Sequence, residues 1–558
     1  MRTVGRLWMV ALLWTTIGAL AQSHPPATDS AATALTAEQW REDLRFFARE
    51  LPRRHTNLFF KTPREQFEAA VAKLDARIPS LQRHQIIVEL ARIVALVGDG
   101  HTHMPIGFDP KLGFREYPLQ FHLFPDGLYV KAADVKADPA YARAVGARVL
   151  HIGKATPEEA YAAVREIVPR DNEMWVKSIA PRLMAIPEVL HGLGVIDDME
   201  KALFVLETGG KQFIVEFRPV TADTHRDMHG LDIPGWANMR DGASAPLPLW
   251  LKDPNRNFWY EYLPDSRTVY VQYNAVLPQG NESPGQFFRK VMEFVGANPV
   301  DRLVLDLRLN GGGNNFFNRP IIHALIRDDK VNQRGKLFTI IGRRTFSAAQ
   351  NCVNELEKHT NTLFVGEPTG ATPNHYGDAE PVTLPNSGIH INASTLWWQD
   401  VDPRDRRPWT PPQIAVDLTS ADYRANRDPV LAAILEYATR EPLTERVRAA
   451  LERGQPEAAR KAIREFRADS RNRYFSPEAE INRLGYELMG QHQLDAAIAV
   501  FQLNVEAFPD SANTYDSLGE AYMNKGEKEL AIKNYEKALE LNPRNFSARA
   551  AIEKLRGK

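Results

Sequence analysis

The sequence predicts a multidomain α/β protein that begins with a helical region and ends in an all-α region. Three observations support this class. Apolar residues recur at helical spacing in the first hundred residues, and helices alternate with short apolar strands through the middle of the chain. A pattern of 34 residues then repeats near the C-terminus. With 558 residues, the chain is long enough to bury several separate cores.

The first 21 residues have the pattern of a secretory signal peptide. Arg2 and Arg6 precede an apolar stretch at 7–20, which ends in a small-x-small sequence. We expect cleavage after about Ala21, followed by a disordered linker over 22–34. An uncleaved anchor is the alternative. Later stretches are too polar to span a bilayer, so no membrane span is expected after signal cleavage.

Residues 35–105 are predicted to be helical, because apolar side chains recur every three or four positions, as over 44–51. Short strand signals follow in the region 106–220. Within it, residues 145–164 resemble the part of a PDZ-like module that leads into its helix. Such a module would bind peptide by adding a strand to its sheet edge. A purely structural αβ insert is the alternative.

Residues 221–254 are rich in Pro, Gly, Asp and Asn, which predicts a linker. Helices and strands alternate again over 255–440, which predicts a sheet covered by helices. Two segments of this core stand out. LVLDLRLNGGGNN at 303–315 is a buried strand that runs into three glycines, and RRTFSAAQ at 343–350 places Ser347 at the start of a helix.

These two segments together indicate acyl transfer at a serine. A glycine run lets backbone N–H groups approach a ligand closely, and such groups can hold a developing oxyanion. A serine at a strand-to-helix turn has the positive end of the helix behind it, which suits a nucleophile. Taken singly, each has a simpler interpretation: the glycines as a loop, and Ser347 as a helix N-cap.

Four motifs carry a family resemblance: GDGHTHM at 98–104, DLRLNGGG at 306–313, TFSAAQ at 345–350 and VGEPTG at 365–370. They resemble the tail-specific, or C-terminal processing, serine peptidases, a group that includes the tricorn protease core and the interphotoreceptor retinoid-binding modules. The resemblance spans roughly residues 35–437. It implies an αβ serine-peptidase core and a secreted endopeptidase that cleaves polypeptides without a metal or organic cofactor.

The resemblance also implies roles for individual residues. Ser347 corresponds to the nucleophile, and the oxyanion-hole N–H groups correspond to Gly311 or Gly312 and to Ala348. One departure matters, because members of the Ser-Lys type carry a lysine base in the loop at 367–378, and here that loop has none.

A histidine base is therefore expected, since an unperturbed imidazole titrates near neutrality. His101 lies where the tricorn-type members carry a catalytic histidine. His375 is the alternative base, because it lies in the loop that would otherwise carry the lysine.

The acid that would orient the histidine is left open by the sequence. The tricorn-type members take it from a late segment, whose counterpart at 397–417 offers Asp400, Asp402 and Asp405. Asp99 is a further candidate, although proximity to His101 in sequence does not imply contact.

The C-terminal repeat is defined by four pairs of positions. Leu484-Gly485, Ala497-Ile498, Phe501 and Pro509 recur 34 residues later as Leu518-Gly519, Ala531-Ile532, Tyr535 and Pro543. This pattern resembles tetratricopeptide repeats over 478–556, preceded by a degenerate helical pair at 441–477. Such arrays bind peptide segments of protein partners in their concave face, or cap a neighbouring domain.

Charge and composition narrow the remaining function classes. The formal net charge is −1 without long runs of one sign, which argues against nucleic-acid or anionic-membrane partners. The single cysteine, Cys352, cannot form an intramolecular disulfide, and export without disulfides fits a bacterial periplasm.

Two other functions stay open: a catalytically inactive peptide- or lipid-binding protein on the same fold, and a repeat-based assembly adaptor.

Overall fold

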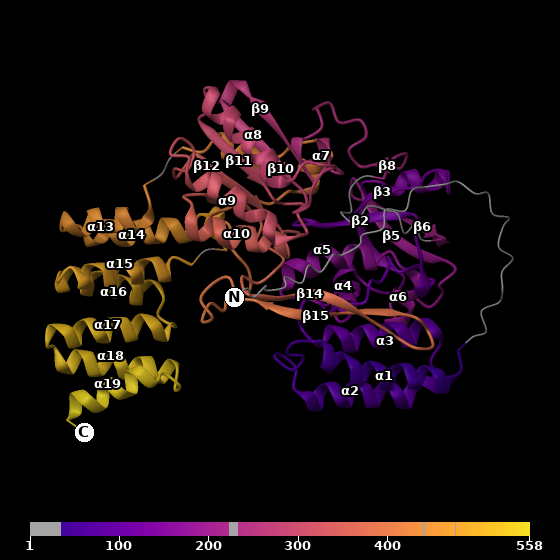
Figure 1. The fold of residues 1–558 in the computed structure, drawn as a ribbon, viewed down its shortest axis with the longest axis horizontal. Coiled ribbons are helices and arrows are strands. Elements are labelled where there is room, and N and C mark those ends of the chain that lie inside the picture. The colour runs from indigo at the N-terminus through magenta and orange to yellow at the C-terminus, as the bar shows by residue number, and fades with distance from the viewer. Residues whose placement is uncertain (1–34, 222–232, 439–440, 475, 558) are drawn as a thin grey trace, which may run out of the picture.

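The computed structural model describes residues 35–221, 233–438, 441–474 and 476–557. Figure 1 shows an α/β part built on strands β9–β13, an N-terminal part, and a separate stack of C-terminal helices. The predicted fold class is confirmed. The predicted signal peptide and its linker lie outside the described residues, as does part of the predicted linker at 221–254. Within the described ranges, no helix has the length and hydropathy needed to cross a membrane.

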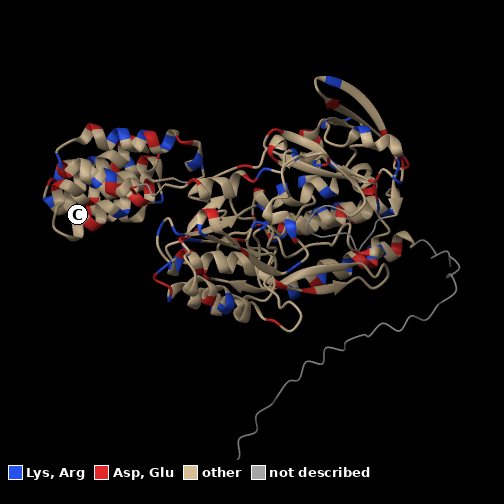
Figure 2. Ribbon diagram, turned by 90° about the horizontal axis from the view of Figure 1, so that it is seen from above, with Lys and Arg blue, Asp and Glu red and all other residues tan. Residues whose placement is uncertain are grey.

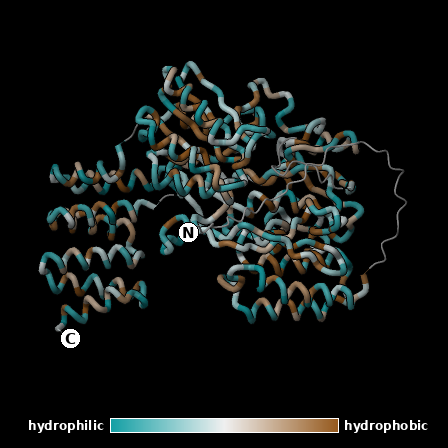
Figure 3. The backbone as a smooth tube through the Cα atoms, in the orientation of Figure 1, coloured by the Kyte–Doolittle hydropathy of each residue, from teal (hydrophilic) through white to brown (hydrophobic). Residues whose placement is uncertain are grey.

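The α/β part is a six-stranded sheet of order β16-β13-β12-β11-β10-β9, in which β9 alone runs antiparallel to its neighbour. Its strands are β9 (Phe258–Leu263), β10 (Thr268–Tyr273), β11 (Arg302–Asp306), β12 (Leu337–Ile341), β13 (Leu363–Gly366) and β16 (Ile414–Ala415). Its helices are α8 (Pro284–Ala297), α9 (Asn318–Ile326), α10 (Ala348–His359) and α12 (Pro429–Leu435). The first three helices cover one face and α12 covers the other, so the strands are buried on both sides and read as continuous apolar runs (brown in Figure 3).

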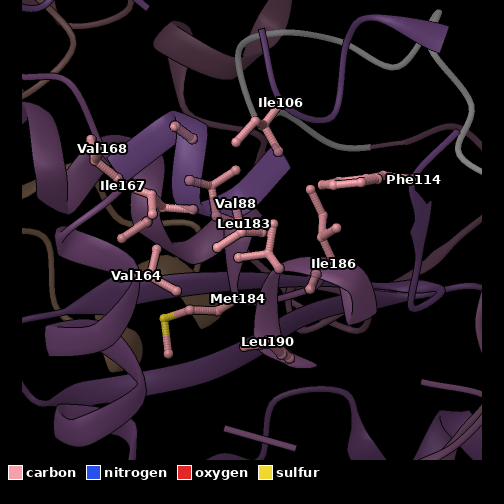
Figure 4. Close-up of a cluster of buried hydrophobic side chains, with 14 of the residues drawn as sticks. Val88, Ile106, Phe114, Val164, Ile167, Val168, Leu183, Met184, Ile186 and Leu190 are labelled. Atoms are coloured by element: carbon pink, nitrogen blue, oxygen red, sulfur yellow. The ribbon is translucent and has the colours of Figure 1, made fainter. Parts of the chain in front are cut away.

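The N-terminal part combines helices with an antiparallel sheet of order β2-β3-β4-β5-β6, to which β8 adds beside β3. The helices are α1 (Ala37–Arg54), α2 (Arg64–Arg77), α3 (Arg83–Ala95), α4 (Pro157–Arg165), α5 (Glu173–Leu183) and α6 (Pro187–Gly192). The strands are β2 (Leu119–Phe124), β3 (Gly127–Ala133), β4 (Arg148–Ile152), β5 (Ala202–Thr208), β6 (Lys211–Phe217) and β8 (Ala237–Asn238). Helices and sheet share one hydrophobic core, part of which Figure 4 shows around Val88 and Leu183.

A β-hairpin joins the two parts. Its strands, β14 (His375–Thr383) and β15 (His390–Trp398), follow the α/β sheet in sequence but pack against the N-terminal helices (Figure 1). Val382 and Ile391 are buried in the N-terminal core. At the tip, the backbone N–H groups of Asn386 and Ser387 each donate to the Asp43 carboxylate at 2.8 Å. The hairpin therefore fixes the loop before it, at 367–374, between the two cores.

Short elements complete these two parts. They are β1 (Arg115–Glu116), which pairs with β7 (Val220–Thr221), the helices α7 (Leu249–Lys252) and α11 (Ser420–Arg424), and the 3-10 turns Ile78–Ser80, Pro110–Leu112, Pro139–Ala144, Pro264–Ser266 and Asn315–Phe317 (η5). A further 3-10 turn, Ser470–Asn472, lies between the C-terminal helices.

The C-terminal helices stack in antiparallel pairs. They are α13 (Leu443–Glu452), α14 (Pro456–Ala468), α15 (Glu478–Gly490), α16 (Leu494–Ala507), α17 (Ala512–Lys525), α18 (Lys528–Leu541) and α19 (Phe546–Arg556). The 34-residue pattern explains how they pack, because a Cβ on Gly485 would lie 2.5 Å from the buried ring of Phe501. In the next repeat, Gly519 faces Tyr535 in the same way, at 3.0 Å. The small residue is required because the facing aromatic side chain fills the space.

We expect Gly485→Ala to destabilise the repeat region by about 1–3 kcal/mol, because the added methyl group overpacks a site whose neighbour cannot move. Gly490→Ala, in the same helix, is the matched control. A Cβ there meets open space, so helix propensity predicts a neutral or slightly stabilising change. Urea unfolding followed by far-UV circular dichroism compares the two, and equal effects would contradict this packing.

Candidate active site

Ser347 lies at the turn between β12 and α10 in a strained backbone conformation. Its φ of 53° and ψ of −129° are rarely adopted by a residue with a side chain. Although it occupies the N-cap position of α10, its side chain makes no capping hydrogen bond. The hydroxyl is thus not used to satisfy the helix. A strained serine at a strand-to-helix turn is the geometry that exposes a nucleophile.

The glycine loop packs directly against this turn. A Cβ on Gly312 would lie 2.6 Å from the Ser347 Cβ and 3.0 Å from the Ala348 nitrogen, so only glycine fits. The Asn310 side chain holds the loop in place by accepting from the Gly312 N–H at 2.9 Å and donating to the Tyr273 carbonyl at 2.9 Å.

The backbone N–H groups predicted to bind the oxyanion differ in whether they already have a hydrogen-bond acceptor. The Gly312 N–H is occupied by Asn310. In the part of the chain that the structure describes, the N–H groups of Gly311 and Ala348 have no hydrogen-bond acceptor. Gly311 faces open space, and Ala348 is the first residue of α10, where the helix dipole favours negative charge.

His101 lies in an aromatic stack beside the serine turn. Its ring stacks on Phe346, with centroids 4.5 Å apart, and Phe346 in turn stacks on Trp175 at 4.1 Å. Both ring nitrogens of His101 are shielded from solvent, and the Tyr376 backbone carbonyl acts on the ring by raising its pKa. Burial, together with the nearby His375, lowers the pKa of His101 to about 3. The ring is neutral at ordinary pH, and Ser347 Oγ does not contact it by a hydrogen bond.

His375 lies in the same pocket, although the two histidines are far apart in sequence. The His101 and His375 rings are nearly parallel, with centroids 5.7 Å apart. The His375 Nδ1–H donates to the Thr372 carbonyl at 3.2 Å, which leaves Nε2 as the lone-pair nitrogen. Burial lowers the pKa of His375, and the charge of Asp400 acts in the opposite direction.

The candidate acids are placed in different surroundings. The Asp400 carboxylate accepts from the Asn351 and Asn354 side chains of α10, so it lies against the serine helix. Asp405 and Asp402 instead pair with arginines of their own loop, at 2.8 Å with Arg407 and 2.7 Å with Arg404. Of these late acids, Asp400 alone acts electrostatically on a histidine of the pocket.

Asp99 supports the backbone of the His101 loop rather than its ring. Its carboxylate accepts from the backbone N–H groups of His101 and Thr102, at 2.9 and 2.7 Å, and from the His55 Nε2–H at 2.9 Å. Burial alone would raise the pKa of Asp99, but these hydrogen bonds and the His55 charge lower it to about 2.

A second buried carboxyl, Asp171, holds the same loop and was not anticipated from the sequence. Its Oδ1 accepts from the Gly100 N–H at 3.0 Å, while Oδ2 is buried, and the Thr372 backbone acts on the carboxyl by lowering its pKa. Burial and the neighbouring Asp99 charge raise the pKa of Asp171 to about 7, against the opposing charge of Lys61. No sequence signal marks Asp171, or Trp175 in the stack, whereas Asn310 lies within the glycine motif itself.

No group of three or more His, Cys, Asp or Glu side chains suited to a metal ion occurs among the described residues. The site residues are the serine, two imidazoles and backbone N–H groups. Their chemistry fits nucleophilic attack on a carbonyl group and proton transfer.

Comparisons with known proteins agree with both parts of this architecture. Residues 513–545 match the tetratricopeptide repeat family. A stretch of 78 residues is 40% identical to the human superkiller complex protein 3, covering 13% of this chain and 5% of that protein. The chain therefore spans only a small part of the length of this curated relative.

Among solved structures, mature CPAF complexed with lactacystin aligns with a TM-score of 0.50 at 13% identity, covering 72% of this chain and 99% of CPAF. The photosystem II D1 C-terminal processing protease aligns over 70% of this chain and 97% of its own, with a TM-score of 0.32 and 15% identity. The first similarity shows a shared fold. The chain thus combines a CPAF-like peptidase fold with a C-terminal tetratricopeptide repeat, which confirms the predicted resemblance.

The strain at Ser347 predicts an effect on stability. Ser347→Gly should relieve about 1–3 kcal/mol of backbone strain, less the entropy that glycine loses on folding. Ser347→Ala keeps the Cβ and therefore the strain. We expect the glycine variant to resist urea about 1 kcal/mol better than the alanine variant, as measured by tryptophan fluorescence. The opposite order would show that the turn is relaxed.

Asp171 predicts a dependence of stability on pH. Its pKa is about 7 in the folded protein and about 3.9 when unfolded, so the folded state binds the extra proton between these values. Stability should therefore fall as pH rises from about 4 to about 7. Asp171→Asn should flatten this slope and be more stable than wild type at pH 8. Thermal unfolding across this pH range tests it, with the exposed Asp265→Asn as the control.

Proposed function

We propose that this chain is a secreted, periplasmic serine endopeptidase that cleaves polypeptides, with Ser347 as the nucleophile and a histidine as the base. The observation that carries this proposal is the strained turn at Ser347, packed against Gly312 at the N-terminus of α10. A serine that only caps a helix adopts a relaxed conformation and uses its hydroxyl on the helix N–H groups. Here the hydroxyl is left available.

In the proposed reaction, Ser347 Oγ attacks the scissile carbonyl carbon while its proton passes to an imidazole. The Ala348 N–H, with that of Gly311, donates to the oxyanion of the tetrahedral intermediate. The imidazolium then protonates the leaving amine. In the second half of the reaction, water attacks the acyl-enzyme carbonyl while its proton passes to the imidazole, and the imidazolium returns a proton to Ser347 Oγ as the acid product leaves. Each oxyanion donor contributes about 3 kcal/mol to lowering the barrier.

The two histidines differ in their suitability as the base. His101 occupies the position that the family resemblance implies, but burial keeps its pKa at about 3, although the Tyr376 backbone carbonyl acts in the opposite direction. Catalysis through His101 therefore requires the Phe346 stack to open when substrate binds. His375 has its Nδ1–H fixed by Thr372 and a carboxylate nearby, which is the usual way to hold a base in one tautomer.

A second function is favoured by the missing hydrogen bond between Ser347 and the histidines of the pocket. Neither histidine forms a hydrogen bond with Ser347, which is the arrangement expected of a catalytically inactive peptide- or lipid-binding protein on this fold. In either case, the tetratricopeptide repeats offer a further surface for a protein partner, and an adaptor function would depend on that surface alone.

Intact mass after treatment with a fluorophosphonate distinguishes these functions. A peptidase gives one adduct on wild type and none on Ser347→Ala. Loss of labelling in His101→Ala with retention in His375→Ala assigns the base to His101, and the reverse pattern assigns it to His375. Cys352→Ala, a buried thiol on the same helix, is the control and should label like wild type. No adduct on folded wild type would overturn the peptidase proposal in favour of a binding protein.

A further inference from the structure

A groove of about 650 Å³ lies between α8 and α9, next to the glycine loop. The two helices touch closely at its floor, where a Cβ on Gly285 would lie 2.9 Å from the Pro320 side chain. Phe316 lines the end of the groove nearest the loop, and Arg327 lines the end furthest along α9. Phe316 belongs to the turn that follows the glycine loop, so the groove begins beside that loop and follows α9 away from it.

Phe316 provides a fixed apolar surface at the entrance. Its side chain is 84% exposed, although its backbone N–H is held by the Asn314 Oδ1 at 3.0 Å. The 3-10 turn that carries it is tied to the serine helix, because the Asn318 side chain donates to the Ala348 carbonyl at 2.7 Å and to Asn315. An exposed aromatic ring on a rigid support binds an apolar group at low entropic cost.

Leu277 lies on the other side of the glycine loop. It is 44% exposed, and its Cγ lies 3.1 Å from where a Gly313 Cβ would be. Gly312 packs against Ser347, and the next residue, Gly313, packs against Leu277. The glycine loop therefore lies between the serine and the apolar side chain of Leu277. The loop thus lies between two exposed apolar side chains, Leu277 and Phe316.

The groove is lined by three arginines and one carboxylate, so its walls carry a net positive charge. Arg289, Arg319 and Arg327 are exposed, and no described residue forms an ion pair or hydrogen bond with their guanidinium groups. Arg319 in α9 and Arg327, directly after the last residue of α9, lie eight residues apart with His323 midway, so all three share one face. The acid at the far end, Asp328, is already engaged by the backbone N–H groups of the following turn.

We propose that this groove binds an acidic segment of the polypeptide substrate, with an apolar side chain of that segment against Phe316. The proposal rests on the proposed peptidase function and specifies its substrate. Four residues, three of them in the turn η5, and then the nine of α9 separate Gly313 from Arg327. Along these elements the path is about 20 Å, which an extended peptide of about six residues spans. Carboxylates of such a segment would meet the arginines in turn, and their attraction would weaken with added salt.

Three unstructured peptides of equal length and the same apolar residues test the proposal. One carries Asp and Glu, the second carries Asn and Gln at the same positions, and the third carries Lys. We expect wild type to cleave the acidic peptide with a kcat/KM at least tenfold above that of the neutral one at low ionic strength. This preference should shrink in high salt. Arg319→Glu/Arg327→Glu should abolish it and favour the Lys peptide.

Two further variants keep the test specific. Arg544→Glu, an exposed charge reversal in the repeat region, should behave like wild type. Phe316→Ser should lower kcat/KM for all three peptides. Fluorophosphonate labelling of Ser347 at the wild-type rate shows that each variant is folded. Equal cleavage of acidic and neutral peptides, or a preference that survives Arg319→Glu/Arg327→Glu, would overturn the inference and leave the peptidase function intact.

The same groove is tested without turnover by fluorescence anisotropy of the three peptides with Ser347→Ala. Tighter binding of the acidic peptide, lost on adding Arg319→Glu/Arg327→Glu, supports the groove even where no peptide is cleaved. In that outcome the peptidase function fails and the binding site stands. Equal binding of all three peptides refutes the inference.

Discussion

The contact between the glycine loop and the turn at Ser347 constrains every other feature of the site. Parallel strands β11 and β12 are neighbours in the sheet, so the segments leaving their carboxyl ends must pass close to each other. They meet with no room for a side chain on Gly312. This close packing supports the strained backbone of Ser347, because a relaxed turn would occupy the space that the loop fills.

The histidines come from outside the α/β sheet, and their placement depends on the N-terminal core. His101 follows α3 and is held by Asp99 and Asp171, whereas His375 begins the hairpin that packs onto the N-terminal helices. The pocket is therefore an interface between two cores. Desolvation in such an interface explains the low pKa values of both imidazoles.

The sequence predicted those residues of the candidate site that lie close together in a short motif. Ser347, Gly312 and Ala348 belong to two short segments that fold as strand, turn and helix, so local patterns predicted that these segments lie at strand ends, and the family resemblance predicted their roles. The acids could not be resolved in this way. Asp400 and Asp405 lie five residues apart in one irregular segment, yet one contacts the serine helix and the other pairs with a neighbouring arginine. No periodicity distinguishes them, because irregular backbone places side chains by its tertiary contacts.

The sequence by itself determined the alternation of helices and strands, the positions of the glycine loop and serine turn, and the repeat whose small residues accept large neighbours. All of these depend on interactions within a few dozen residues, which hydrophobic periodicity and turn chemistry record. Only the tertiary structure decided that His101 and His375 share a pocket and that Phe346 stacks between His101 and Trp175. It also decided that the Gly312 N–H is occupied by Asn310. The aromatic contacts join segments more than a hundred residues apart and are fixed by the packing of whole layers, which no local pattern encodes.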